Sequence, residues 1–156
     1  EWGNGIVANL ARRPQGNDRA QAKAIFQGQC DVAIMNHYYY GKMLFSDIPE
    51  QREWAKAIRL VFPNQENRGA HMNISGGGVA KHSPNRESAV AFLEFLTKPS
   101  AQQLYGEVNF EYPVNPSVSP GGVLASWGDF KRDDLSIERL AELAPQAQMI
   151  IDRIGW

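Results

Sequence analysis

An unbroken apolar run, Val-Ala-Ile-Met at residues 32–35, narrows the choice of fold more than any other stretch of this sequence. Four consecutive apolar residues without alternation are typical of a short strand covered on both faces. The run follows the pattern of a short helix, which Asp18 can cap and which extends through Phe26, with Gly28 placed to end it. A helix followed by a buried strand predicts an α/β fold.

The remainder of the chain continues this mixture of helices and strands. Helical spacing recurs in four stretches: residues 38–44, 83–96, 99–107 and 136–155. Strand-like stretches lie at residues 58–62, 71–74 and 79–80. The helix at 83–96 carries apolar residues along one side, so we expect it to pack in the core, with Ser83 as its N-cap. Ser136 caps the last helical region, which we expect to break or kink before Pro145.

Charge and composition exclude several classes of function. The 156 residues carry a net charge of -1 with acids and bases interspersed, so we expect no basic face for nucleic acid. No apolar run reaches the roughly 18 residues that a membrane-spanning helix needs. The single cysteine, Cys30, argues against an internal disulfide and against a zinc site built on thiols. Nucleophile-elbow and zinc-protease motifs are absent, so we expect no enzyme.

Three consecutive tyrosines, Tyr38, Tyr39 and Tyr40, follow the predicted strand directly. In open α/β sheets, ligands bind outside the carboxyl ends of the strands, so a site is expected here. Two neighbouring side chains converge on one point only where regular structure begins or ends, as at a strand-to-helix junction. A helix N-terminus and a bound cation both favour phenolate, and anionic oxygen suits a hard cation such as ferric iron. The alternative is that the three rings are packing residues with their hydroxyls at the surface.

Five segments, in their order and spacing, resemble the ferric-binding subunits of bacterial iron ABC importers, the cyanobacterial and proteobacterial periplasmic ferric-binding proteins. These segments, which span nearly the whole chain, are GNDRAQAKAI, DVAIMNHYYYG, HMNISGGGVAKHSPN, AVAFLEFLT and FEYPVNP. In that family a tyrosine pair after an Asn-X dipeptide binds Fe(III). The resemblance therefore implies that Tyr38 and Tyr39 are metal ligands, whereas Tyr40 is a packing residue and His37 is not a ligand.

The resemblance also implies a small anion, such as carbonate or phosphate, beside the iron. Asn17 and Asn36 match anion contacts of the family by position, and Arg19 lies near them in the sequence. An alternative interpretation makes Asn17 a helix cap and Asn36 a turn residue at the end of the strand. Both interpretations of the two asparagines remain open at the level of sequence.

Members of the family have the type II periplasmic binding protein fold, with iron in the cleft between two lobes. The resemblance assigns residues 1–73 and 120–156 to the C-terminal lobe, and residues 74–119 to a segment that crosses into the N-terminal lobe. The implied function is capture of Fe(III) in the periplasm and its delivery to an inner-membrane ABC permease. An alternative keeps the fold and changes the solute to a phosphonate, a polyamine, thiamine or a sugar.

The remaining iron ligands of the family would precede Glu1. Two phenolates offset only part of the charge of a ferric ion, so we expect this chain to be part of a longer protein whose N-terminal part completes the site. The first residues show neither an initiator methionine nor the pattern of a signal peptide. We therefore expect a secreted protein whose signal peptide lies outside this sequence.

Overall fold

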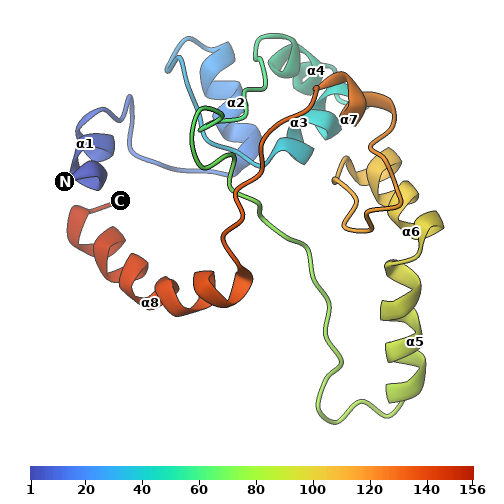
Figure 1. Cartoon of the computed structure of the whole chain (residues 1–156). Coiled ribbons are helices and arrows are strands. Elements are labelled where there is room, and N and C mark those ends of the chain that lie inside the picture. Colours follow the sequence, from blue (N-terminus) through green and yellow to red (C-terminus); the bar gives the residue numbers. More distant parts are fainter.

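The computed structural model describes all residues from Glu1 to Trp156. Its regular elements are helices, joined by irregular and extended segments (Figure 1). In chain order they are α1 (Trp2–Ala8), α2 (Asp18–Phe26), α3 (His37–Leu44), α4 (Pro49–Lys56), α5 (Arg86–Leu96), α6 (Pro99–Leu104), the π-helical turn η1 (Tyr105–Asn109), α7 (Gly122–Ser126) and α8 (Ile137–Ile154). None of these helices is both long and apolar enough to span a lipid bilayer.

The segments predicted as strands do not form strands. The only pairing between extended segments is a single parallel bridge between Ala70 and Arg132. Val32 and Ile34, predicted to be buried, are 83% and 82% exposed. A strand needs a neighbouring segment to satisfy its backbone hydrogen bonds and to cover its faces, and residues 31–36 pair with no other segment of this chain. The prediction of a strand covered on both faces is therefore wrong within these 156 residues.

The best-packed part of the molecule is the contact between α2, α3 and α4. Ala22, Met43 and Ala55 lie at its centre and are fully buried, one from each helix. The small side chains of the two alanines let the helices approach closely around the longer Met43. Local signals start two of these helices: Asn17 Oδ1 accepts a hydrogen bond from the Ala20 N–H (3.1 Å), and Pro49 occupies the first turn of α4.

The segment after α6 returns to this core and packs on α3. Phe110 has a left-handed backbone (φ 58°) at the end of η1, and its ring lies directly against Gly41 of α3. A side chain larger than hydrogen at Gly41 would collide with this ring, so the glycine permits the close approach. The Phe110 ring also stacks on Phe45, with centroids 5.5 Å apart and planes 11° apart. These contacts hold η1 beside α3.

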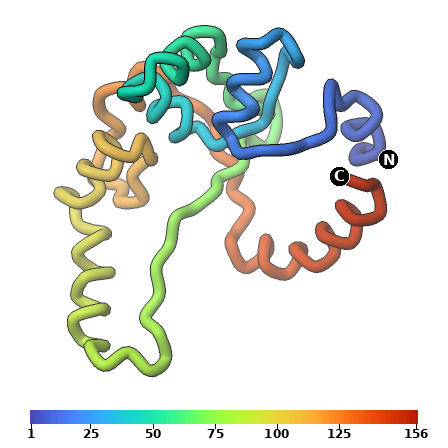
Figure 2. The backbone as a smooth tube through the Cα atoms, turned by 180° about the vertical axis from the view of Figure 1, so that it is seen from behind, coloured from blue at the N-terminus to red at the C-terminus, as the bar shows by residue number.

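The helix predicted to lie in the core, α5, is peripheral. Figure 2 shows the green part of the chain running outward from the helical body as a long extended segment and returning through α5. No residue of α5 is buried, and Phe92 is 59% exposed. The helix begins at Arg86 with Asn85 as its N-cap, not at Ser83 as predicted. Its apolar side has no covering element in this chain.

The last helix, α8, has the bounds that its sequence predicted and is one continuous helix. Ser136 Oγ accepts a hydrogen bond from the Arg139 N–H (3.2 Å), as expected of an N-cap, and Gly155 ends the helix in a left-handed conformation (φ 73°). Of the break or kink expected before Pro145, the break does not occur, because the helix is continuous through this residue. Instead α8 forms an arc (Figure 2). A proline removes one backbone hydrogen bond and crowds the preceding turn, which bends a helix without ending it.

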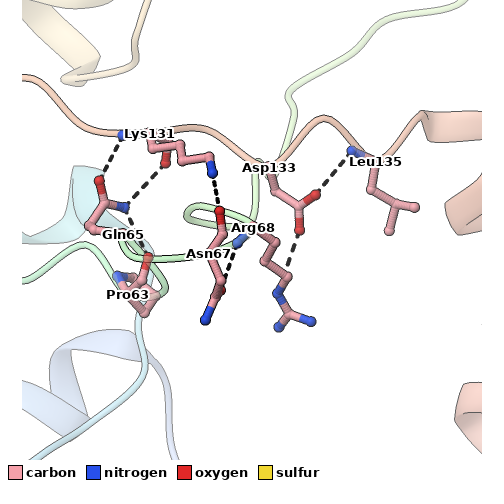
Figure 3. Close-up of polar contacts among 7 residues, drawn as sticks. All are labelled: Pro63, Gln65, Asn67, Arg68, Lys131, Asp133 and Leu135. Atoms are coloured by element: carbon pink, nitrogen blue, oxygen red, sulfur yellow. Dashed lines mark hydrogen bonds and ion pairs between the residues drawn. The ribbon is translucent and has the colours of Figure 1, made fainter.

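Two segments far apart in sequence are joined where the outward excursion begins and the chain returns. The Ala70 N–H donates to the Lys131 carbonyl, and the Asp133 N–H donates to the Ala70 carbonyl, both at 2.9 Å. Gln65 Oε1 accepts from the Lys131 N–H (2.7 Å), while Gln65 Nε2 donates to the Lys131 carbonyl (3.2 Å; Figure 3). Gly69, at φ 93°, lies so close to the backbone of residues 131 and 132 that no Cβ fits. We call this junction the neck.

Candidate metal centre

The tyrosine pair lies on the first turn of α3, where the sequence predicted it. The ring centroids of Tyr38 and Tyr39 are 4.3 Å apart and their planes are inclined by 32°. Both side chains are partly exposed, so a metal could reach them from solvent. A hydrogen bond between the two hydroxyls, helped by desolvation and by the charge of the Tyr39 phenolate, raises the pKa of Tyr38 to about 12. The Tyr38 phenol therefore holds its proton at neutral pH, and a metal must displace it.

Two cationic side chains flank the pair. The Arg19 guanidinium lies 4.9 Å from the centre of the Tyr39 ring, and Lys42 Nζ lies 5.4 Å from the centre of the Tyr38 ring. Arg19 Nε is buried and has no hydrogen-bond partner. The sequence interpretation included Arg19 but missed Lys42. Its position four residues after Tyr38, one helical turn along the same face, is the signal that could have found it.

The other two candidate anion contacts have hydrogen-bond partners of their own. Asn17 is the N-cap of α2, as its alternative interpretation stated. Asn36, at the N-cap position of α3, donates from its backbone N–H (2.7 Å) and from Nδ2 (3.3 Å) to Asp18 Oδ1. Asn36 Oδ1 accepts from Asn73 Nδ2 at 3.1 Å. Asp18 and Asn36 thus tie the start of α2 to the start of α3, close to both Arg19 and the tyrosine pair.

The contacts of His37, the residue before the pair, argue against a role as a metal ligand. Its Nε2 lies 2.9 Å from the Phe110 carbonyl oxygen. Its ring is surrounded by aromatic rings, with centroid distances of 5.1 Å to Tyr112 and 5.7 Å to Trp127. Burial lowers the pKa of His37, against the opposing effects of the Phe110 hydrogen bond and the Glu111 charge. His37 is therefore a neutral, packed side chain at neutral pH.

Tyr40 has the packing role that the sequence predicted. It lies against the core of Ala22, Met43 and Ala55, and its ring centroid is 5.7 Å from that of Trp127. No group of three or more histidine, cysteine, aspartate or glutamate side chains is arranged to hold a metal ion anywhere in the chain. The candidate ligands of this chain are therefore the two phenols of Tyr38 and Tyr39, which suit a hard ion.

Comparison with known proteins gives a consistent family assignment. Residues 11–103 match the family described as bacterial extracellular solute-binding protein. Iron uptake protein A1 of Synechocystis sp. is 44% identical over 155 residues, which are 99% of this chain and 43% of that protein. The ferric binding protein from Campylobacter jejuni superimposes with a TM-score of 0.93 at 37% identity, over 99% of this chain and 49% of that one. A Trichodesmium protein in complex with iron and citrate ligands gives 0.92 at 44% identity, with coverages of 99% and 49%.

These matches also bear on the fold class. The solved structures have the type II periplasmic binding protein fold, which is the fold predicted from the sequence. The chain spans about half the length of the relatives it matches. It follows the course of that half closely, although its own extended segments are not paired into a sheet. The chain belongs to the family of bacterial extracellular solute-binding proteins.

Proposed function

We propose that this chain is part of a periplasmic ferric-ion-binding protein in which Tyr38 and Tyr39 supply two phenolate ligands. The observation that carries the proposal is the tyrosine pair itself, with rings 4.3 Å apart on the first turn of a helix and a cation beside each ring. The names of the relatives support the choice of metal, since they describe an iron uptake protein and ferric binding proteins. They favour iron over a phosphonate, a polyamine, thiamine or a sugar.

The chemistry of the pair suits Fe(III). Phenolate oxygen is a hard anionic donor, and a triply charged ion compensates the free energy needed to remove the phenol protons. Arg19 and Lys42 add positive charge beside the rings, which favours phenolate once the protons have left. Two phenolates leave one positive charge on the ion. Further ligands must therefore come from a part of the protein outside this chain or from an anion.

Arg19 is our candidate for holding such an anion. Its Nε is buried without a partner, whereas Asn17 caps α2 and Asn36 is bonded to Asp18 and Asn73. A guanidinium group binds carbonate or phosphate through parallel N–H donors. Asn17 and Asn36 would then orient the surrounding backbone, and their role in binding the anion would be indirect. Substituting Arg19 by Lys keeps the charge and removes the paired donors, so it separates these two contributions.

The exposed apolar segments support the proposal that another part of a longer protein covers them. Val32, Ile34 and Val61 belong to stretches with strand character and are largely uncovered in this chain. We propose that residues 1–73 and 120–156 form a C-terminal lobe, that residues 74–119 cross into an N-terminal lobe, and that this lobe supplies the covering strands and the remaining ligands. Closure of the two lobes on Fe(III) would create the surface that an inner-membrane ABC permease distinguishes, and no catalysis is required.

The test is the colour of the ferric complex. Ferric phenolates absorb visible light by charge transfer from oxygen to iron. We would titrate the chain with Fe(III) held by nitrilotriacetate, a chelator that leaves adjacent coordination positions free. A visible band should appear, and it should be lost or strongly weakened in Tyr38→Phe and in Tyr39→Phe. Tyr40→Phe, which removes a hydroxyl of the same type next to the pair, is the matched control and should keep the band.

The proposal would be contradicted by the absence of a band, or by a band that is unchanged in both Tyr38→Phe and Tyr39→Phe.

The other solutes are tested on the same chain by its stability against heat. Stabilisation of the chain against heat by a phosphonate, a polyamine, thiamine or a sugar, with none by Fe(III), would favour the second function.

A further inference from the structure

His37 makes the one hydrogen bond that joins α3 to residues 105–112. Its Nε2 is 2.9 Å from the carbonyl oxygen of Phe110, which is 73 residues away in sequence. A carbonyl oxygen only accepts hydrogen bonds, so the Nε2 of His37 is the donor. The bond therefore connects the residue directly before the tyrosine pair to a distant turn of the chain.

The acceptor is itself held firmly against α3. The ring of Phe110 lies on Gly41 and stacks on Phe45 with centroids 5.5 Å apart. His37, Gly41 and Phe45 are spaced by four residues, so they form one stripe along the helix. Phe110 contacts all three members of this stripe, through its carbonyl at the first and its ring at the other two. Three contacts along a stripe fix the rotation of a helix about its own axis.

We propose that His37 is a positioning residue for Tyr38 and Tyr39: by donating to the Phe110 carbonyl, it fixes the direction in which the first turn of α3 presents both phenols. This inference rests on the proposed function. Adjacent residues of a helix are about 100° apart around the axis, so the orientation of His37 determines those of the next two side chains. A metal site tolerates only a few tenths of an ångström in its bond lengths, which makes this orientation matter.

Beside its aromatic contacts, the first turn of α3 has few side-chain hydrogen bonds that restrain it. Asn36 makes no side-chain cap with the helix, and it is tied instead to Asp18 on the α2 side. The His37 bond provides the restraint on the opposite side, toward Phe110. Loss of this bond leaves the ring contacts of Phe110 with Gly41 and Phe45 in place. We therefore expect the fold to persist while the first turn, and with it the phenols, gains freedom.

The experiment compares His37→Phe with His37→Gln in the full 156-residue chain. Phenylalanine keeps an aromatic ring among Tyr112 and Trp127 but cannot donate a hydrogen bond, whereas glutamine carries an amide donor at a similar reach. Each variant is titrated with Fe(III)-nitrilotriacetate. Affinity, band intensity per bound iron and band position are measured. His82→Phe, at an exposed histidine outside the helices, is the matched control.

We expect His37→Phe to weaken iron binding about 10- to 100-fold, the range found when a partner that orients a metal ligand is removed, and to shift the visible band. His37→Gln should restore most of the affinity and the original band position. The control should behave as the unchanged chain.

Three results would overturn the inference. His37→Phe with unchanged affinity and band would remove the role of His37 while leaving the proposed function intact. Failure of His37→Gln to bind better than His37→Asn, whose shorter amide does not reach Phe110, would show that the hydrogen bond is not responsible. The comparison of His37→Gln with His37→Asn also tests the role of the hydrogen bond if the phenylalanine variant does not fold. A chain that shows no band before any substitution would overturn the proposed function, and the role of His37 with it.

Discussion

The α2–α3–α4 core and the outward excursion at residues 71–96 contain similar apolar side chains but bury them very differently. In the core, Ala22, Met43 and Ala55 are fully covered by one another and by their neighbours. In the excursion, Ile74 and Phe92 are more than half exposed. Both regions have regular sequence patterns, so the difference lies in what is available to pack against them. Only 11 of the 156 residues are buried, and α2, α3 and α4 contain five of them, whereas α5 contains none.

The largest expected effect tests this difference directly. Met43→Ala removes a fully buried side chain from the centre of the core and should lower the free energy of unfolding by about 2–5 kcal/mol. Val32→Ala, at a side chain that is 83% exposed, should change it by less than about 0.5 kcal/mol. Urea unfolding of both variants measures the two values. Equal losses would break the comparison, because they would mean that Val32 is covered in solution.

A smaller loss is expected where η1 docks onto the core. Gly41→Ala places a methyl group against the Phe110 ring, and overpacking of this kind costs about 1–3 kcal/mol. The better helix propensity of alanine offsets about 1 kcal/mol of this cost. Gly5→Ala is the control, since no atom lies within 4 Å of its new methyl group, and it should stabilise α1 slightly. Thermal unfolding followed by circular dichroism compares them, and a stabilised Gly41→Ala would contradict the close approach.

The neck connects the two regions, and its expected contribution is modest. Gln65→Ala removes the hydrogen bonds of this side chain to Lys131 and Pro63, and should cost about 1 kcal/mol because the residue is exposed. Gln29→Ala, which loses only a bond to another exposed glutamine, is the control. Hydrogen exchange at the Ala70 and Asp133 amides should accelerate in Gln65→Ala alone. Unchanged exchange there would show that the backbone bridge holds without the side chain.

The smallest effect concerns protons and leaves the fold intact. Tyr39→Phe removes the hydrogen bond that raises the pKa of Tyr38 to about 12, so this pKa should fall toward its ordinary value of 10.0. Because the folded-state value is the higher one, the bond stabilises the fold below about pH 10, and its contribution is lost as the pH rises through about 12. Ultraviolet absorbance of phenolate during alkaline titration measures this. Tyr40→Phe should leave the late-titrating phenol in place.

Local signals in the sequence were sufficient to predict several helices and their ends. The helices expected through Phe26 and at residues 38–44 form, although Asn17 and not Asp18 caps the first of them, and Ser136 caps α8 and Gly155 ends it as expected. Capping residues and helical spacing act within a few positions, so they can be read without knowing the fold. The short helices α1, α4 and α7 were missed, although Pro49 at the start of α4 is a helix signal.

Features that depend on distant residues could not be predicted in this way. The strand patterns at residues 31–36 and 58–62 have the right composition, but neither segment forms a hydrogen-bonded ladder with another segment of this chain. The location of the tyrosine pair at the start of a helix could be predicted, because the pair follows the apolar run directly in sequence. The contact of His37 with Phe110 could not, since it joins residues 73 positions apart. Its only trace in the sequence is Gly41, whose small size marks a close approach.

The neck also has a consequence for the entropy of the chain. It closes a loop of more than sixty residues, because Gln65 and Lys131 are 66 positions apart. The entropic cost of bringing the ends of such a loop together rises only slowly with its length, by about 0.6 kcal/mol for each doubling. Gly76 and Gly78 lie on this loop, and a Cβ added at either position would meet no atom within 4 Å. Extra residues inserted there would lengthen the excursion while leaving the closure at its base almost unchanged.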